Sequence, residues 1–177
     1  DGSTMTIVLS RTEQDRYVMG RELGRGGLGR VVLALDRDLM SREVAMKLML
    51  DGQGEVDVRH AGASPSPSTP PARERFLEEA QITAQLQHPN IVAVYELGTR
   101  PGGDLYYTMP VITGRSLKDE IRAAHARLAK AEIPPEAWGL ERLKLIAAYQ
   151  GLCHGLSYAH ARGVIHRDVK PANVMVG

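Results

Sequence analysis

The sequence has 177 residues, enough for one domain or two small lobes with a buried core. A net charge of +1, one Phe, one Trp and six Tyr argue against nucleic acid as a partner, because neither a basic surface nor a base-stacking platform is indicated. The single Cys153 excludes an internal disulfide and suits the reducing cytoplasm, and no apolar run approaches the roughly 18 residues of a membrane span.

The first part of the chain, residues 1–16, is polar apart from a short apolar patch at 7–9. We expect it to form a flexible leader.

A glycine-rich stretch at 24–31 follows an expected strand at 17–23 and precedes expected strands at 31–36 and 43–49. The spacing Gly24, Gly26, Gly29 occurs in dinucleotide-binding loops, in kinase glycine loops and in plain hairpins. A dinucleotide-binding loop opens a helix, whereas this one opens a strand. Two interpretations therefore remain: a flap whose backbone N–H groups approach a triphosphate, or an ordinary glycine-rich hairpin.

Lys47 lies on the third expected strand, in the sequence Val-Ala-Met-Lys. Strand alternation places it on the same face as Ala45, beneath the glycine stretch. A small Ala leaves room for a flat base, and the lysine can reach phosphates, although a solvated strand lysine is the simpler alternative.

Residues 51–72 are rich in Ser and Pro towards their end and read as a mobile insertion. Two Ser-Pro steps within it are either phosphorylation sites or part of a plain disordered segment.

A helix is expected at 73–87, between Pro71 and Pro89. Glu79 falls on the packed stripe with Phe76, where a carboxylate needs a partner, and Lys47 is the obvious one. The alternative is that Glu78 and Glu79 both face solvent.

Two further strands are expected at 90–98 and 105–112, which completes a lobe of five strands and one helix. Beyond them the pattern turns helical, first from an N-cap at Ser116 to about residue 130, then from 140 to 162. The second of these helices is apolar on more than one side and is expected to be buried, with Gly163 as its C-cap.

The stretch 164–176 holds a compact polar loop, which we expect to lie between two short strands. In it, the Asp168 carboxylate can accept a hydroxyl proton, and the Lys170 ammonium can face a phosphoryl group. The Asn173 amide oxygen can ligate Mg²⁺. The order His-Arg-Asp followed by Asn five positions after the Asp matches a known catalytic loop.

Taken together, these motifs resemble a protein kinase of the Hanks type, and most closely the bacterial, eukaryotic-like serine/threonine kinases. The resemblance covers about 17–177 and rests on five motifs in order, at 24–31, 44–47, 75–80, 88–92 and 166–173. It implies an α+β fold with a five-stranded antiparallel N-lobe carrying one αC-type helix, at 17–112. The first helices and the catalytic loop of a truncated helical C-lobe would follow at 113–177.

The resemblance also implies the activity, transfer of the ATP γ-phosphate to Ser or Thr hydroxyls of a protein substrate, with Mg²⁺ as cofactor. Asp168 would be the catalytic base, Lys170 the phosphate-facing lysine, and Lys47 with Glu79 the pair that positions the phosphates. Asn173 would be a metal ligand, and Met109 the gatekeeper in preference to Thr108. ATP would be held by Leu23, Gly24, Arg25, Gly26, Gly27, Leu28, Gly29, Arg30, Val31, Ala45, Lys47, Met109, Pro110, Ile112 and Met175.

The sequence departs from the family pattern in two places. Lys47 and Glu79 are 32 positions apart, longer than usual, and the insertion at 51–72 accounts for the excess. The chain ends at Gly177, before an Asp-Phe-Gly motif and an activation segment, so we expect this piece alone to have little activity. We also expect the apolar surface of the 140–162 helix to be covered, for example by a second copy of the chain.

Two other functions stay open beside the kinase interpretation: a non-catalytic, nucleotide-binding module resembling a pseudokinase, and a small-molecule phosphotransferase. Whether the parent protein carries a membrane segment further along is likewise open.

Overall fold

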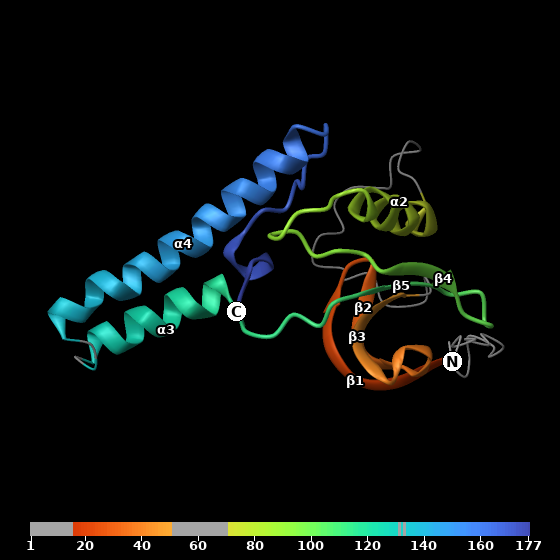
Figure 1. Cartoon of the computed structure of the whole chain (residues 1–177), viewed down its shortest axis with the longest axis horizontal. Coiled ribbons are helices and arrows are strands. Elements are labelled where there is room, and N and C mark those ends of the chain that lie inside the picture. Colours follow the sequence, from red (N-terminus) through yellow and green to blue (C-terminus); the bar gives the residue numbers. More distant parts are fainter. Residues whose placement is uncertain (1–15, 51–70, 131, 133) are drawn as a thin grey trace, which may run out of the picture. The chain divides into compact units, whose positions relative to one another are not determined.

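The computed structural model describes residues 16–50, 71–130, 132 and 134–177, in two compact units (Figure 1). The first unit is formed by the described residues up to 84 together with 94–111, and the second by 85–93 with those from 112 onward. Each is described by itself. The expected leader, except Arg16, and almost all of the expected insertion lie outside the described residues.

The first unit is built on an antiparallel sheet with the strand order β1-β2-β3-β5-β4, which confirms the expected five-stranded lobe. The strands are β1 (Tyr17–Gly26), β2 (Gly29–Asp36), β3 (Arg42–Met49), β4 (Glu96–Thr99) and β5 (Leu105–Met109). A short 3₁₀ turn, η1 (Arg37–Leu39), joins β2 to β3.

The two faces of this sheet bury two separate clusters, because successive side chains of a strand point to opposite faces. One face carries the cluster Tyr17, Val32, Ala34, Val44, Met46, Leu48 and Tyr106. The other is covered by helix α2 (Ala72–Ala84), whose Phe76 and Ala80 pack against Leu105 and Tyr107. Lys47, which alternates with Met46 and Leu48, therefore lies on the α2 face.

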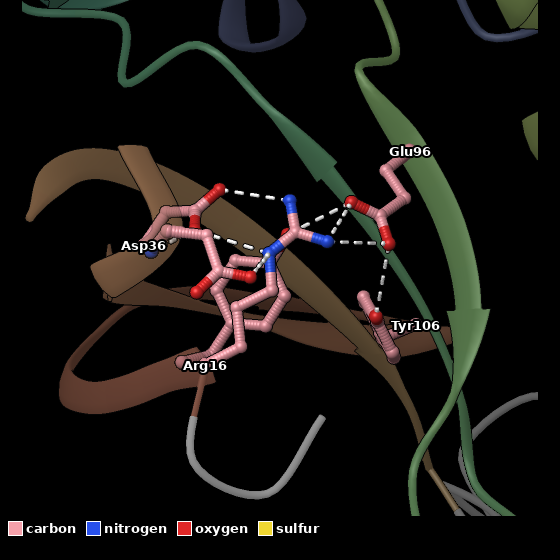
Figure 2. A network of polar contacts seen from close by, with 6 residues as sticks. Arg16, Asp36, Glu96 and Tyr106 are labelled. Atoms are coloured by element: carbon pink, nitrogen blue, oxygen red, sulfur yellow. Dashed lines mark hydrogen bonds and ion pairs between the residues drawn. The ribbon is translucent and has the colours of Figure 1, made fainter. Parts of the chain in front are cut away.

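An ionic cluster ties the start of β1 to the end of β2 and the start of β4 (Figure 2). Arg16 donates two hydrogen bonds to Asp36, at 3.0 and 3.1 Å, and one to Glu96 at 3.0 Å. The Tyr17 hydroxyl donates to the second carboxylate oxygen of Glu96 at 3.0 Å. Burial tends to raise the pKa of the Asp36 carboxyl, but the hydrogen bonds and charge of Arg16, together with a hydrogen bond from the Asp38 amide, hold that pKa below its usual value.

The fourth strand is shorter than expected, since β4 begins at Glu96 and not at residue 90. Residues 85–93 belong instead to the second unit, where they pack against helix α4 (Pro135–His160). Asn90 lies over two glycines of that helix: a Cβ on Gly151 would be 3.0 Å from the Asn90 side chain, and one on Gly155 would be 3.3 Å from its carbonyl oxygen. This packing, which strand alternation does not reveal, holds residues 90–93 in the second unit and away from the sheet. The fifth strand also ends early, at Met109.

The second unit contains α3 (Leu117–Ala129) and α4, which an ion pair between Arg127 and Glu141 links. The expected N-cap is confirmed, because the Ser116 hydroxyl accepts a hydrogen bond from the Asp119 amide at 3.1 Å. Helix α4 begins at Pro135, earlier than the expected residue 140, and a proline is favoured in a first helical turn because its missing N–H has no partner there. Gly163 follows the helix with φ of +74°, as a C-cap glycine should.

Four apolar side chains of α4 are exposed, although we expected this helix to be buried. They are Leu140, Leu143, Ile146 and Tyr149, with 44–64% of each accessible. No helix in the described ranges is both long and apolar enough to cross a membrane.

A two-stranded ladder anchors the end of the chain in the second unit. Strand β6 (Arg115–Ser116) pairs with β7 (Met175–Val176), and the Leu117 amide donates to the Val174 carbonyl at 2.7 Å. Gly114 precedes the ladder with φ of +113°, and a Cβ there would lie 2.2 Å from the Val176 carbonyl oxygen. The expected short strand at 164–165 is absent, so the polar loop has a strand on one side only, which is a correction to the sequence-based expectation.

Candidate active site

The glycine stretch forms a tight turn between β1 and β2, in which Gly26 pairs with Gly29. A Cβ on Gly29 would lie 2.4 Å from the Leu48 carbonyl oxygen, so the sheet itself requires glycine at this position. At Gly24, Gly26 and Gly27 a Cβ would meet nothing within 4 Å, and none of the three has a positive φ. Within the described residues, packing therefore does not explain these glycines, and space for an external group remains beside them.

Lys47 of β3 and Glu79 of α2 form the ion pair that the sequence predicts. The Lys47 side chain is only 16% exposed. On α2, Glu78 is exposed, so Glu79 and not its neighbour is the partner of Lys47. Phe76 and Tyr107 place their ring centroids 5.8 and 5.5 Å from the Lys47 ammonium, close enough for cation–π attraction.

Tyr107 of β5 is part of this arrangement and was missed by the sequence analysis. Its hydroxyl donates to Oε1 of Glu79 at 2.7 Å. Alternation along the strand could have revealed it, because Leu105, Tyr107 and Met109 must share one face.

Ala45 and Met109 are cross-strand partners on the α2 face, and Val31 pairs with Lys47. Thr108, in contrast, is 1% exposed and pairs with Met46, whose side chain belongs to the opposite cluster. Of the two gatekeeper candidates, Met109 is therefore the one on the face of Lys47. The remaining expected nucleotide contacts of this unit lie in or beside the β1–β2 turn, apart from one residue that directly follows β5. They are Leu23, Arg25, Leu28 and Arg30 at the turn and Pro110 after β5.

The polar loop of the second unit gathers Asp168, Lys170 and Asn173. The Asp168 carboxylate accepts hydrogen bonds from Lys170 Nζ and from Asn173 Nδ2, each at 2.9 Å. Asn173 Nδ2 also donates to the Asp168 carbonyl at 2.9 Å, which closes the loop around the acid. The backbone turns sharply before it, since Arg167 has φ of +62°, a conformation rare outside glycine.

These hydrogen bonds hold the pKa of the Asp168 carboxyl below its usual range, Lys170 contributing most and Asn173 next. Asp168 is thus ionised at neutral pH and can only accept hydrogen bonds and protons. Its side chain is 62% exposed, so an incoming hydroxyl can reach it.

In the part of the chain that the structure describes, no three His, Cys, Asp or Glu side chains cluster as they would around a metal ion. Asn173 uses its amide nitrogen towards Asp168, and no described residue bonds its amide oxygen. That oxygen is a ligand of the type Mg²⁺ accepts, but it would need others. Ile112 and Met175 also belong to the second unit, and Met175 is 45% exposed.

The five-stranded lobe, the Lys47–Glu79 pair and the polar loop are features of a protein kinase domain, and comparison with protein families agrees. Residues 17–177 match the family described as "Protein kinase domain". The chain therefore belongs to the protein kinase domain family.

Similar proteins are bacterial kinases. Serine/threonine-protein kinase PknD of Chlamydia muridarum is 35% identical over 162 residues, which are 92% of this chain and 16% of that protein. The PknD of Protochlamydia amoebophila is 34% identical over 166 residues, 93% of this chain and 15% of that protein. A probable serine/threonine-protein kinase of Corynebacterium efficiens is 35% identical over 179 residues, 97% of this chain and 22% of that protein. These relatives confirm the expected resemblance to bacterial Hanks-type kinases, and the chain spans less than a quarter of their lengths.

Proposed function

We propose that the protein carrying this chain transfers the γ-phosphoryl group of ATP to Ser or Thr hydroxyls of protein substrates. The observation that carries the proposal is the Lys47–Glu79 ion pair, which holds a largely buried ammonium on the face of the sheet shared with Ala45 and Met109. The names of the bacterial relatives supply the serine/threonine class.

ATP fits the residues of the first unit. Gly24, Gly26 and Gly27 leave open space where backbone N–H groups could approach phosphates without a side chain between. In this proposal Val31, Ala45, Met109, Pro110, Ile112 and Met175 hold the adenine, and Leu23, Arg25, Leu28, Gly29 and Arg30 complete the turn over the phosphates. Lys47 holds the phosphate oxygens while Glu79 keeps it in place.

The chemistry belongs to the polar loop. Asp168 accepts the proton of the substrate hydroxyl while the hydroxyl oxygen bonds to the γ-phosphorus. The bond from that phosphorus to the β,γ-bridging oxygen breaks, which releases ADP. Lys170 places its ammonium beside the transferring group, and Asn173 holds the loop closed around Asp168. Mg²⁺, held in part by Asn173, would neutralise negative charge on the phosphate oxygens.

In this proposal the activity belongs to the cytoplasm, where ATP is available. The second candidate is a nucleotide-binding module without catalysis, because the open space at the glycine turn and the Lys47–Glu79 pair would serve nucleotide binding alone equally well.

The test uses the full-length protein and two variants, Asp168→Asn and Lys47→Met, with Lys118→Met as a control on the exposed surface of α3. We measure transfer of labelled phosphate from ATP to protein, and ATP binding by calorimetry. Asp168→Asn should lower turnover by about 10²–10⁴-fold, the usual contribution of a general base, and still bind ATP. Lys47→Met should lose both turnover and affinity.

Full turnover by Asp168→Asn would overturn its assignment as the base. Wild-type protein that binds ATP but transfers no phosphate would favour the non-catalytic module.

A further inference from the structure

The hydroxyl of Tyr107 makes a contact that the proposed phosphotransfer does not yet use. Tyr107 stands opposite Lys47 in the β3–β5 ladder, and its side chain is directed at α2. Its hydroxyl and the Lys47 ammonium both bind Oε1 of Glu79, so one carboxylate oxygen receives two donors from two different strands.

We propose that Tyr107 is a positioning residue: its hydroxyl holds the Glu79 carboxylate towards Lys47 before nucleotide binds. This inference rests on the proposed function, because it assigns Tyr107 to the same Lys47 site.

Glu79 needs such a second donor because the other contacts of α2 do not fix its carboxylate. Phe76 and Ala80 attach the helix to Leu105 and Tyr107 through apolar burial, which has no preferred direction. The Glu79 side chain is 36% exposed, so its carboxylate has water available as an alternative partner. Lys47 ends a flexible four-carbon chain and can follow the carboxylate when it moves.

Tyr107 is suited to fix this position because it is rigid and buried. The residue is 6% exposed, and its ring lies 5.3 Å from that of Phe76. A tyrosine has only two side-chain torsions, and its burial in the cluster with Phe76 leaves the hydroxyl little freedom.

The hydroxyl also remains a donor under all working conditions. Burial raises the pKa of Tyr107 most, and the hydrogen bond to the Glu79 carboxylate raises it further. The phenol therefore stays protonated at neutral pH.

The expected consequence is a preformed ion pair. If the hydroxyl is removed, Glu79 spends part of its time facing water, and only the remaining fraction of molecules holds Lys47 ready for phosphate. The apparent dissociation constant for ATP equals the intrinsic constant divided by that competent fraction, so apparent affinity falls. Saturating ATP restores the ion pair. The Michaelis constant for ATP should therefore rise while kcat changes little.

The test is Tyr107→Phe in the full-length protein, which removes one oxygen and keeps the ring against Phe76 and Lys47. From the usual strength of a hydrogen bond to a charged group, reduced for the exposure of Glu79, we expect KM for ATP to rise about three- to thirty-fold, with kcat within about two-fold. The matched control is Tyr106→Phe, which removes a hydroxyl from the next residue of β5, where the ring belongs to the opposite cluster. This control should leave KM for ATP unchanged.

A second measurement uses the protein without nucleotide. Hydrogen–deuterium exchange of the α2 amides should accelerate in Tyr107→Phe, and not in Tyr106→Phe, while amides of β2 and β3 keep their protection. In a Glu79→Ala background, Tyr107→Phe should add no further acceleration.

The proposal is overturned if Tyr107→Phe leaves KM for ATP within two-fold of wild type, if α2 exchange is unchanged, or if Tyr106→Phe has the same effect. Lys47→Met separates this failure from that of the proposed function. If Lys47→Met abolishes transfer and Tyr107→Phe has no effect, only the role of Tyr107 is wrong; if Lys47→Met retains transfer, the proposed function is wrong.

Discussion

At the scale of single residues, the glycines of the β1–β2 turn have different physical reasons to be glycine. A Cβ on Gly29 would collide with the Leu48 carbonyl, whereas one on Gly26 would meet open space. The first is therefore explained by the sheet, and the second is explained by a bound nucleotide in the proposed function.

Substitution by alanine should separate these two reasons. Gly29→Ala should lower the free energy of unfolding by about 1–3 kcal/mol, the usual cost of overpacking, while Gly26→Ala should change it by less than about 0.5 kcal/mol. Gly26→Ala should instead weaken ATP binding. Chemical denaturation and calorimetry of the two variants check this, and equal stability of both would contradict the steric argument.

The Arg16–Asp36 contact predicts a loss of stability in acid. Because the pKa of Asp36 is lower in the folded state than in the unfolded chain, the ionised carboxylate stabilises the fold above about pH 4, the unfolded value. That contribution is lost as the pH falls through the lower, folded-state pKa. Asp36→Asn should therefore cost about 1–3 kcal/mol at pH 7 and less below pH 4, measured by denaturation at both pH values. A difference between the two proteins that does not shrink in acid would count against this.

At the scale of helices and strands, alternation and helical phase predicted what lies on each face more reliably than where elements end. Lys47, Ala45 and Glu79 were assigned to the correct faces, because one side of β3 and one stripe of α2 must be buried. The strand expected from residue 90 failed because Asn90 packs on glycines of α4, a contact between segments far apart in the sequence. Alternation along β5 could have placed Tyr107 on the face of Lys47, but its hydrogen bond to Glu79 joins a strand to a helix, and no local pattern specifies such a bond.

Two glycines of α4 allow a test of that packing. Gly139 has open space around it, whereas a Cβ on Gly155 would lie 3.3 Å from the Asn90 carbonyl oxygen. Gly139→Ala should stabilise the protein by about 0.5–1 kcal/mol through helix propensity. Gly155→Ala should be less stable than Gly139→Ala by about 1 kcal/mol or more, because the segment at Asn90 must move. Thermal unfolding measures both, and equal gains would show that Asn90 moves aside freely.

At the scale of the whole molecule, the sequence indicated the family through motifs spread from the glycine turn to the polar loop. Each motif alone left alternatives, and their order decided between them. The exposure of α4 could not be predicted, because an apolar pattern favours burial of a helix but does not specify which segment would cover it.

The exposed side chains of α4 predict self-association of the 177-residue chain. Leu140, Leu143 and Tyr149 are each about 60% exposed and lie on one helix, and burial of such side chains against a second copy would be favourable. Sedimentation at increasing concentration should show association that Leu143→Lys weakens. Leu39→Lys, which changes an exposed leucine of the first unit, is the control, and a chain that stays monomeric at every concentration would contradict the prediction.

The ladder between β6 and β7 makes Gly114 a position where substitution should affect the polar loop from a distance in the sequence. A Cβ on Gly114 would lie 2.2 Å from the Val176 carbonyl oxygen, so only glycine allows this close approach to β7, the strand that directly follows the polar loop. A side chain at 114 would push that strand away and loosen the surroundings of Asp168 without touching any reacting atom. A screen for loss of phosphotransfer should therefore recover substitutions at Gly114 alongside those in the loop itself, although the sequence between them gives no hint that the two sites are neighbours.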